Sequence, residues 1–287
     1  IGIVEFNGNR FTATDILKFA DMALYEAKRK GKNKYEVYIK KLNKPSLERT
    51  HMESILRKAM SNNFEGLVIN YQPVINSQTG KIHSAEALLR INHEGKLILP
   101  EKFLNLANYL GFMIPIGEYV MRSAAKVCKK IVDMGLDDFY IAINLSEKQV
   151  NQKDIIPLIK SAINDSGISY KNFAVSFRED YSIEAPQKMF KICKTIQQYG
   201  IRVILDEFGT GNSSFLNLRQ LPIDVVKMSK LFMERLDDKY SSDFLKLIIS
   251  LGRSLDKSIC INGIENQEQY QYAVDCGADQ LQGFHFY

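Results

Sequence analysis

From about residue 66 onward, short apolar runs of strand length alternate with amphipathic stretches of helical period, such as 116–135 and 189–200. Alternation of this kind over roughly 220 residues predicts an α/β domain with a parallel sheet, and the number of runs favours a modified TIM (β/α)8 barrel over an open doubly wound sheet. The eight predicted strands are GLVINYQP (66–73), KIHSAEALLR (81–90), FYIAINLS (139–146), FAVSFRE (173–179), RVILDE (202–207), DVVKMS (224–229), SICING (258–263) and DQLQG (279–283).

The N-terminal part of the chain is patterned differently. Residues 1–6 and 34–38 are typical of short strands, and residues 12–31 of an amphipathic helix with Thr14 as N-cap and Gly31 just past its end. Two strands and one helix form a small α/β fragment that buries little core by itself.

Three segments follow from these patterns. Residues 1–38 are predicted to be the end of a domain whose front precedes this chain, and residues 39–63 a linker with a connecting helix. Residues 64–287 are predicted to form the barrel.

Polar residues interrupt the apolar runs near the predicted C-terminal ends of the strands. In a TIM barrel these ends form one face, which carries the active site. Any one such residue is explained equally well as a helix cap or a solvated loop residue, but eight on one face predict a site. They are Gln72, Glu86, Asn144, Glu179, Asp206, Lys227, Asn262 and Gln282.

Charge and composition exclude several classes of function. Residues 1–50 hold eleven Lys or Arg and six Asp or Glu, so the whole net charge of +5 is local to them. The barrel region is therefore balanced, which argues against a partner of duplex nucleic acid. No apolar run reaches the roughly 18 residues needed to cross a bilayer. The start of the chain also lacks the pattern of a signal peptide.

The cysteines are widely spaced, and none is part of a CxxC pair. Three lie in apolar patterns, which predicts buried free thiols in a reducing compartment. The histidines show no metal-ligand spacing. We therefore expect a cytoplasmic domain, with a membrane anchor elsewhere in a longer parent protein left open. The cysteines are Cys128, Cys193, Cys260 and Cys276.

The run EALLR at residues 86–90 resembles the signature of EAL domains, which are phosphodiesterases of the bacterial second messenger cyclic di-GMP (c-di-GMP). Further matches follow in order along the chain. They are YQPV (71–74), INLS (143–146), DEFGTGNSS (206–214), LPIDVVK (221–227), NGIE (262–265) and QGF (282–284). The stretch ADMALYEAKRKGKNKY is similar to the last helix and strand of GGDEF domains, the diguanylate cyclase-like domains that often precede EAL domains.

The resemblance implies a site with two divalent cations, Mg²⁺ or Mn²⁺, that clamp the scissile phosphodiester and activate water. Residue by residue, it gives Glu86, Asn144, Asp206 and Glu207 as metal ligands, and Lys227, Gln282 and again Glu86 as catalytic residues of the reacting centre. It also implies that Gln72 and Arg90 contact the ligand together with Lys227 and Gln282, Arg90 at a phosphate. Glu179 is expected to support the loop after Glu207, and Glu265 to be a structural partner.

The departures from the family pattern point away from catalysis. Acidic residues near the metals are replaced by Ser176, Asn262 and Ser229, and Glu207 stands where the family has Asp. Two divalent ions bring four positive charges, whereas Glu86, Asp206 and Glu207 supply three negative ones. The interpretation is a catalytically degenerate domain with no resident metal, in which Asp206 pairs with Lys227.

Three functions stay open at this point. The first is a c-di-GMP-binding or signalling module of a GGDEF–EAL protein. The second is a weak metal-dependent phosphodiesterase that gives the linear dinucleotide. The third is a scaffold for an unknown protein partner, with a vestigial pocket in which Arg90 bridges to Glu86 or Asp206. The family also implies a homodimer through residues 208–220, where Phe215, Leu216 and Leu218 face either the partner or the core.

Overall fold

The computed structural model describes residues 1–6, 12–29, 33–38, 47–184, 186–210, 215–234 and 239–286. The chain divides into two compact units, Ile1–Ser61 and Asn62–Tyr287. The predicted linker at 39–45 and the helix-ending Gly31 lie outside the described residues. The boundaries at 38/39 and 63/64 stay predictions.

The first unit contains β1 (Gly2–Ile3), α1 (Ala13–Arg29), β2 (Glu36–Val37) and α2 (Leu47–Ser61). Strands β1 and β2 pair in parallel, and the Phe19 and Tyr38 rings stack at 4.3 Å. The predicted cap at Thr14 is wrong. Asp15 Oδ2 accepts the Thr12 N–H at 3.0 Å and Thr12 Oγ1 accepts the Asp15 N–H at 3.2 Å, so the reciprocal cap begins α1 two residues earlier.

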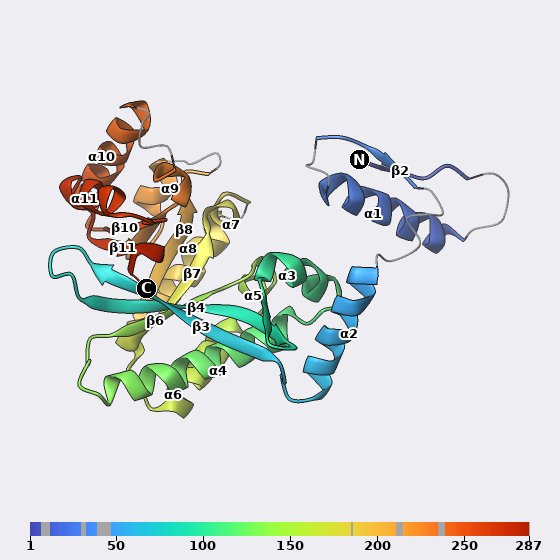
Figure 1. The fold of residues 1–287 in the computed structure, drawn as a ribbon, viewed down its shortest axis with the longest axis horizontal. Coiled ribbons are helices and arrows are strands. Elements are labelled where there is room, and N and C mark those ends of the chain that lie inside the picture. The colour runs from blue at the N-terminus through green and yellow to red at the C-terminus, as the bar shows by residue number, and fades with distance from the viewer. Residues whose placement is uncertain are drawn as a thin grey trace. The chain divides into compact units, whose positions relative to one another are not determined.

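The second unit is a closed barrel of eight strands within the described residues (Figure 1), which confirms the predicted fold class. All eight predicted strands are present, and their order around the barrel is β3-β11-β10-β9-β8-β7-β6-β4, with β4 pairing back to β3. Their bounds are β3 (Leu67–Asn76), β4 (Ile82–His93), β6 (Tyr140–Asn144), β7 (Phe173–Arg178), β8 (Arg202–Phe208), β9 (Val225–Met228), β10 (Ser258–Asn262) and β11 (Gln280–Gln282).

The expected all-parallel order is wrong for the first strand. Strand β3 runs antiparallel to both neighbours, β4 and β11. Only five residues join β3 to β4, and a parallel crossover needs a dozen or more. Asn76 Oδ1 accepts the N–H groups of Gln78 and Thr79, and Gly80 takes φ +65°, so this connection is a tight turn. Gln72 is therefore within a strand and not at a carboxyl end.

A further strand, β5 (Lys96–Ile98), pairs antiparallel with β4 and was not predicted. Glu94 and Gly95 between them have φ +51° and +78°, as in a two-residue type I′ hairpin turn. Strands β3 and β4 themselves extend beyond the barrel as a long paired ribbon (Figure 1).

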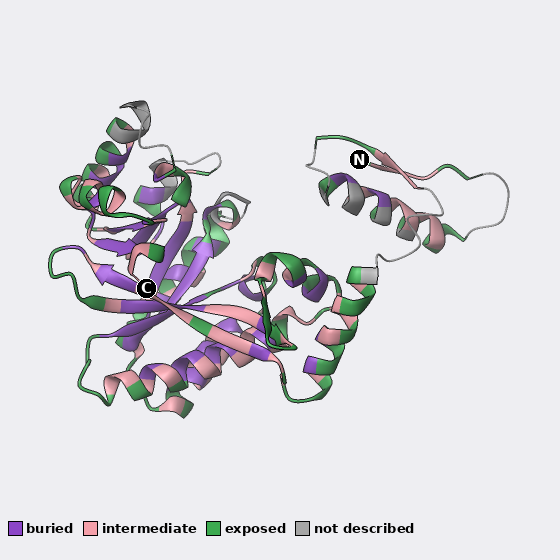
Figure 2. Cartoon of the chain, in the orientation of Figure 1, coloured by how far each residue is buried: buried purple, intermediate pink, exposed green. Residues whose placement is uncertain are grey.

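Helices follow most of the parallel strands and cover the outside of the barrel, while the strands form its buried interior (Figure 2). The barrel centre is filled by Val74, Tyr140, Ala142, Ala174, Ile204, Val225 and Cys260. The helices are α3 (Pro100–Tyr109), α4 (Met113–Val132), α5 (Glu147–Val150), α6 (Ile155–Ser166), α7 (Glu179–Glu184), α8 (Pro186–Gln198), α9 (Phe215–Gln220), α10 (Lys239–Ser254) and α11 (Gln267–Asp275), with 3₁₀ turns η2 (Tyr170–Asn172), η3 (Lys230–Phe232) and η4 (Phe284–Phe286).

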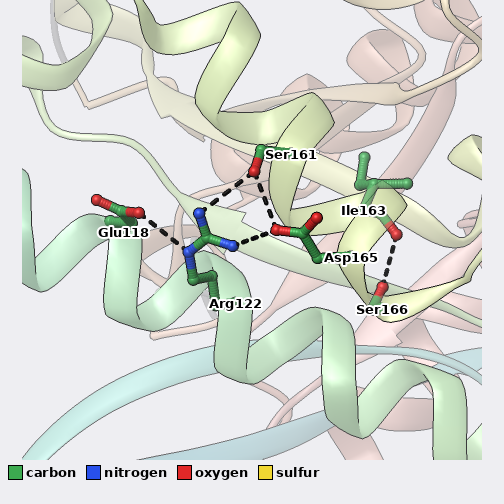
Figure 3. A network of polar contacts seen from close by, with 6 residues as sticks. All are labelled: Glu118, Arg122, Ser161, Ile163, Asp165 and Ser166. Carbon is green, nitrogen blue, oxygen red and sulfur yellow. Dashed lines mark hydrogen bonds and ion pairs between the residues drawn. The ribbon is translucent and has the colours of Figure 1, made fainter.

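On the outer surface, α4 and α6 are joined by one polar network (Figure 3). Arg122 donates to Glu118 at 3.0 Å, to Asp165 at 2.5 Å and to Ser161 Oγ at 3.2 Å. Arg122 and Glu118 are half-buried and Asp165 is exposed, so the network orients two helices without carrying a fully buried charge.

Three of the four cysteines, Cys128, Cys193 and Cys260, are buried, and Cys276 is half-buried; all four are free, as expected. In the described part of the chain, no helix is long and apolar enough to cross a membrane.

Candidate functional site

Glu86 is the centre of a buried polar cluster near the carboxyl ends of the parallel strands. Its Oε2 accepts hydrogen bonds from Lys227 Nζ at 2.5 Å and Gln282 Nε2 at 2.9 Å, and its Oε1 accepts one from Asn144 Nδ2 at 2.6 Å. The donors come from β9, β11 and β6, so the barrel brings three distant segments to one carboxylate on β4. Both oxygens of Glu86 thus face protein donors.

Asp206, on β8, is the second acid of this cluster. Its Oδ2 lies 3.8 Å from Lys227 Nζ, and its Oδ1 accepts the N–H of Glu207 at 2.8 Å. The predicted pairing of Asp206 with Lys227 is therefore present, but Glu86 is the nearer partner of the ammonium. One cation lies between two carboxylates.

Burial and charge act in opposite directions on these groups. Burial disfavours the Lys227 ammonium, but Asp206 and Glu86 outweigh it, and the pKa of Lys227 is raised. Burial also disfavours the Glu86 carboxylate, yet Lys227 and the two amide donors lower its pKa. For Asp206, burial is only partly offset by the more distant Lys227, so its pKa is raised. The Lys227 ammonium therefore interacts chiefly with the Glu86 carboxylate.

Two further predicted residues lie on the β3–β4 ribbon. Gln72 is directly opposite Glu86 in the antiparallel ladder, which puts both side chains on the same face. Arg90 is four residues along β4 from Glu86 and shares its face by alternation. Arg90 Nη1 donates to the Leu89 carbonyl at 2.8 Å. Among the described residues it forms no ion pair with Glu86 or Asp206, which contradicts the bridging alternative.

Neutral residues occupy the positions where the sequence resemblance leads one to expect acids. Ser176 is buried on β7 and lines the same cavity as Glu86, and its Oγ has no hydrogen-bond partner among the described residues. Asn262 Oδ1 accepts the N–H of Gly263 at 2.9 Å. Ser229 is buried, and its Oγ accepts the Leu231 N–H at 3.5 Å at the start of η3. None of the three adds negative charge.

The segment around Glu207 departs from regular strand geometry. Glu207 has φ +57°, and the β8–β9 register shifts between Leu205 and Phe208, which is the geometry of a bulge. Glu179 Oε2 accepts the N–H of Gly209 at 3.2 Å, the loop-supporting contact expected of it. The side chain of Glu265 is exposed.

The expected dimer region, 208–220, is described only in part. Residues 211–214, and the side chains of Phe215 and Leu216, lie outside the described residues. Leu218 is fully buried, so it faces the core of this chain.

A small cavity lies inside the barrel against Glu86, Ser176 and Lys227, with about 20 Å³ available to the centre of a water-sized sphere. Tyr140 and Gln280 also line it, and Tyr140 OH donates to Gln280 Oε1 at 3.4 Å. These two residues were not predicted, although Gln280 is two residues before Gln282 and so shares its face. A water molecule fits this cavity, and a nucleotide does not.

The donor set does not fit two divalent cations. Magnesium and manganese sites require several anionic oxygens free to coordinate. Here the Glu86 oxygens accept protein hydrogen bonds, an ammonium lies against them, and Ser176 and Asn262 are neutral. In the segments that the structure describes, no group of three or more His, Cys, Asp or Glu side chains is placed to hold a metal.

Two curated relatives resemble nearly the whole chain. It is 33% identical over 288 residues to the signaling protein YkoW of Bacillus subtilis, covering 100% of this chain and 36% of that protein. It is 30% identical over 286 residues to the bifunctional diguanylate cyclase/cyclic di-GMP phosphodiesterase MucR of Pseudomonas aeruginosa, covering 99% of this chain and 42% of that protein. The chain thus spans less than half the length of these relatives.

The fold and a family model agree with this similarity. The solved structure of the PaMucR phosphodiesterase in complex with c-di-GMP superposes with a TM-score of 0.78 at 29% identity, covering 82% of this chain and 96% of that one. The model of the EAL domain matches residues 53–287. With this match over most of its length, and with a barrel that carries Glu86, Asn144, Lys227 and Gln282 in one cluster, the chain belongs to the EAL domain family.

Proposed function

We propose that residues 62–287 bind c-di-GMP without hydrolysing it and act as a signalling module. The observation that carries this proposal is the state of Glu86, whose two oxygens accept from Lys227, Gln282 and Asn144. A two-metal mechanism needs these oxygens on the ions that polarise the phosphodiester. Ser176 and Asn262 supply no replacement charge.

Arg90 supports the binding half of the proposal. Its guanidinium makes no ion pair among the described residues, and its planar fork suits the oxygens of a phosphate. Gln72 lies on the same face of the β3–β4 ribbon. Because the interior cavity admits only a water molecule, a dinucleotide would lie across the barrel mouth. The related PaMucR phosphodiesterase has been solved as a c-di-GMP complex.

A weak phosphodiesterase is the second candidate, and one observation favours it. Asn144, Lys227 and Gln282 each donate a hydrogen bond to Glu86, and Asp206 lies 3.8 Å from the Lys227 ammonium. These are residues that the family resemblance assigns to the metals and to the reacting centre. If the Lys227 contact opened, Glu86 and Asp206 would be two carboxylates available to an Mg²⁺ or Mn²⁺ ion.

The role of the first unit is also a proposal. A parallel β1–β2 pair packed with α1 supports the view that residues 1–38 are the end of a GGDEF-like domain. The similarity to MucR, whose name includes a diguanylate cyclase, supports it as well. On this proposal the chain contains the end of a cyclase-like domain followed by a phosphodiesterase-like domain, both from one signalling protein.

Isothermal titration of c-di-GMP in Mg²⁺ buffer, with chromatography of the recovered nucleotide, tests the proposal. We expect saturable binding and intact c-di-GMP. Arg90→Ala should weaken binding by about 10- to 100-fold, because a charge-assisted phosphate contact is worth about 1.5–3 kcal/mol. Arg122→Ala is the matched control, since it removes an arginine from the outer surface and should leave the affinity unchanged.

Three results would contradict the proposal in different ways. Recovery of the linear dinucleotide in excess Mn²⁺ means that hydrolysis survives. Absence of binding heat, confirmed by equilibrium dialysis, favours a scaffold for a protein partner. Equal losses in Arg90→Ala and Arg122→Ala would place the ligand elsewhere.

A further inference from the structure

The position of Lys227 bears on which cation occupies the site, apart from the proposed loss of catalysis. Its Nζ is 2.5 Å from Glu86 Oε2 and 3.8 Å from Asp206 Oδ2, and its side chain is 9% exposed. A calcium ion binds carboxylate oxygens at about 2.3–2.6 Å, so the ammonium is at the distance from Glu86 where a cation would coordinate. A divalent ion that took Glu86 Oε2 would therefore have to displace this ammonium.

The charges around the ammonium leave little room for a further acid. Glu86 and Asp206 are the acids in contact with it, and Ser176, which lines the same cavity, is neutral. A carboxylate at position 176 would put a third acid against one ammonium. The neutral residue and the salt bridge are thus consistent with each other.

We infer that the Lys227 ammonium is the resident cation of this site: it holds the Glu86 and Asp206 carboxylates together, and a divalent ion binds there only when it is removed. Gln282 supplies a further oxygen donor for that case. Its Oε1 is buried and has no hydrogen-bond partner within the described residues, while its Nε2 donates to Glu86. This inference does not depend on nucleotide binding, so it stands or falls separately from the proposed function.

The test compares wild-type protein with Lys227→Met, which keeps the side-chain length and removes the charge. Thermal unfolding is followed in EDTA and in Ca²⁺, and Mn²⁺ binding is measured from the electron paramagnetic resonance signal of the free ion. We expect the wild-type melting temperature to move by less than about 1 °C with Ca²⁺. Lys227→Met should be less stable in EDTA and should regain roughly 3 °C or more in Ca²⁺.

Two variants serve as controls. Lys227→Arg keeps the positive charge and should respond to Ca²⁺ no more than the wild type. Lys257→Met removes another partly buried ammonium, whose Nζ donates to the Ile223 carbonyl at 2.8 Å, and it should lose stability without any response to Ca²⁺. If Lys227→Met does not fold, Lys227→Gln replaces it, because an amide still donates to Glu86.

Either of two results would overturn the inference. One is wild-type Mn²⁺ binding with a dissociation constant below about 100 μM, which would mean that the ammonium and the metal coexist. The other is a folded Lys227→Met or Lys227→Gln protein that responds to Ca²⁺ and Mn²⁺ no more than the wild type. Metal binding by the neutral variants alone supports it.

Discussion

The Lys227–Glu86 pair lies inside the barrel, whereas the Arg122 network lies on its outer surface, between α4 and α6 (Figure 3). The two inner side chains are each 9% exposed, while Arg122 is 38% and Asp165 61% exposed. Both are short contacts between a cation and a carboxylate, so the difference between them is chiefly one of surroundings.

That difference decides what each contact does. Water can replace either partner of the outer network at little cost, and such pairs usually contribute little to stability. Inside the barrel, a charge that loses its partner stays buried, so the pair is a constraint on which residues and ions the site accepts. The geometry of the inner pair therefore bears on function, whereas that of the outer network bears on how two helices are held.

Removing one inner partner should give the largest effect. Glu86→Gln leaves the Lys227 ammonium with Asp206 as its nearest acid, and we expect a loss of about 3 kcal/mol in the free energy of unfolding. Urea denaturation measures it. The double variant Glu86→Gln/Lys227→Met should lose less than the sum of the two single variants, because each single variant already removes the same Glu86–Lys227 contact and only Asp206 is left without its cation. A single-variant cost as small as that of an exposed pair would mean that the inner pair is solvated.

The inner cluster was also the part of the site that the sequence predicted best. Parallel strands end on one face of a barrel. Polar residues at the ends of apolar runs, such as Asn144, Lys227 and Gln282, could therefore be predicted to lie together on that face. The sequence does not give distances across the barrel. Lys227 on β9 was expected to pair with Asp206 on the adjacent β8, but its nearer partner is Glu86, on β4.

Two features of the fold that the sequence analysis did not anticipate have local causes. The segment NSQTGK between the first two strands is too short for a helical crossover, and its Asn and Gly favour a turn. The antiparallel direction of β3 could therefore have been predicted from the sequence. The positive φ of Glu207 could not be predicted in this way, because Glu is not among the residue types that favour this conformation, and the bulge shows only where β8 pairs with β9.

The outer network should give a smaller effect. Arg122→Ala removes contacts to Glu118, Asp165 and Ser161, yet we expect the melting temperature to fall by less than about 2 °C. The difference from wild type should shrink further between about 0.05 and 0.5 M NaCl, because salt screens exposed charges. Differential scanning calorimetry at both salt concentrations checks this. A loss that matched Glu86→Gln and was independent of salt would remove the contrast between the two regions.

In burial, His83 lies between the Lys227–Glu86 pair and the Arg122 network. Its replacement should give the smallest effect on stability, visible only as a change in how stability depends on pH. It is half-buried at the edge of the Tyr140 ring, with the ring centroids 5.1 Å apart. Arg202 lies over the same ring. Burial, and then the charge of Arg202, lower the pKa of His83, and Asp138 acts in the opposite direction without reversing the shift. The folded chain therefore binds this proton less readily than the unfolded chain, whose histidine has a pKa of about 6.5.

The sign of the effect follows from proton linkage. Between the lowered pKa and about 6.5 the unfolded state holds more protons, so the contribution of His83 to stability is complete above 6.5 and is lost as the pH falls through this window. Urea midpoints at about pH 7.5 and 5.5 should differ more for the wild type than for His83→Gln, by a few tenths of a molar at most. Carboxylates that titrate nearby affect both proteins alike, so the difference isolates the histidine. An equal pH response in the two proteins would mean that His83 is as well solvated as the outer network. Of the groups compared here, burial would then affect only the Lys227 cluster.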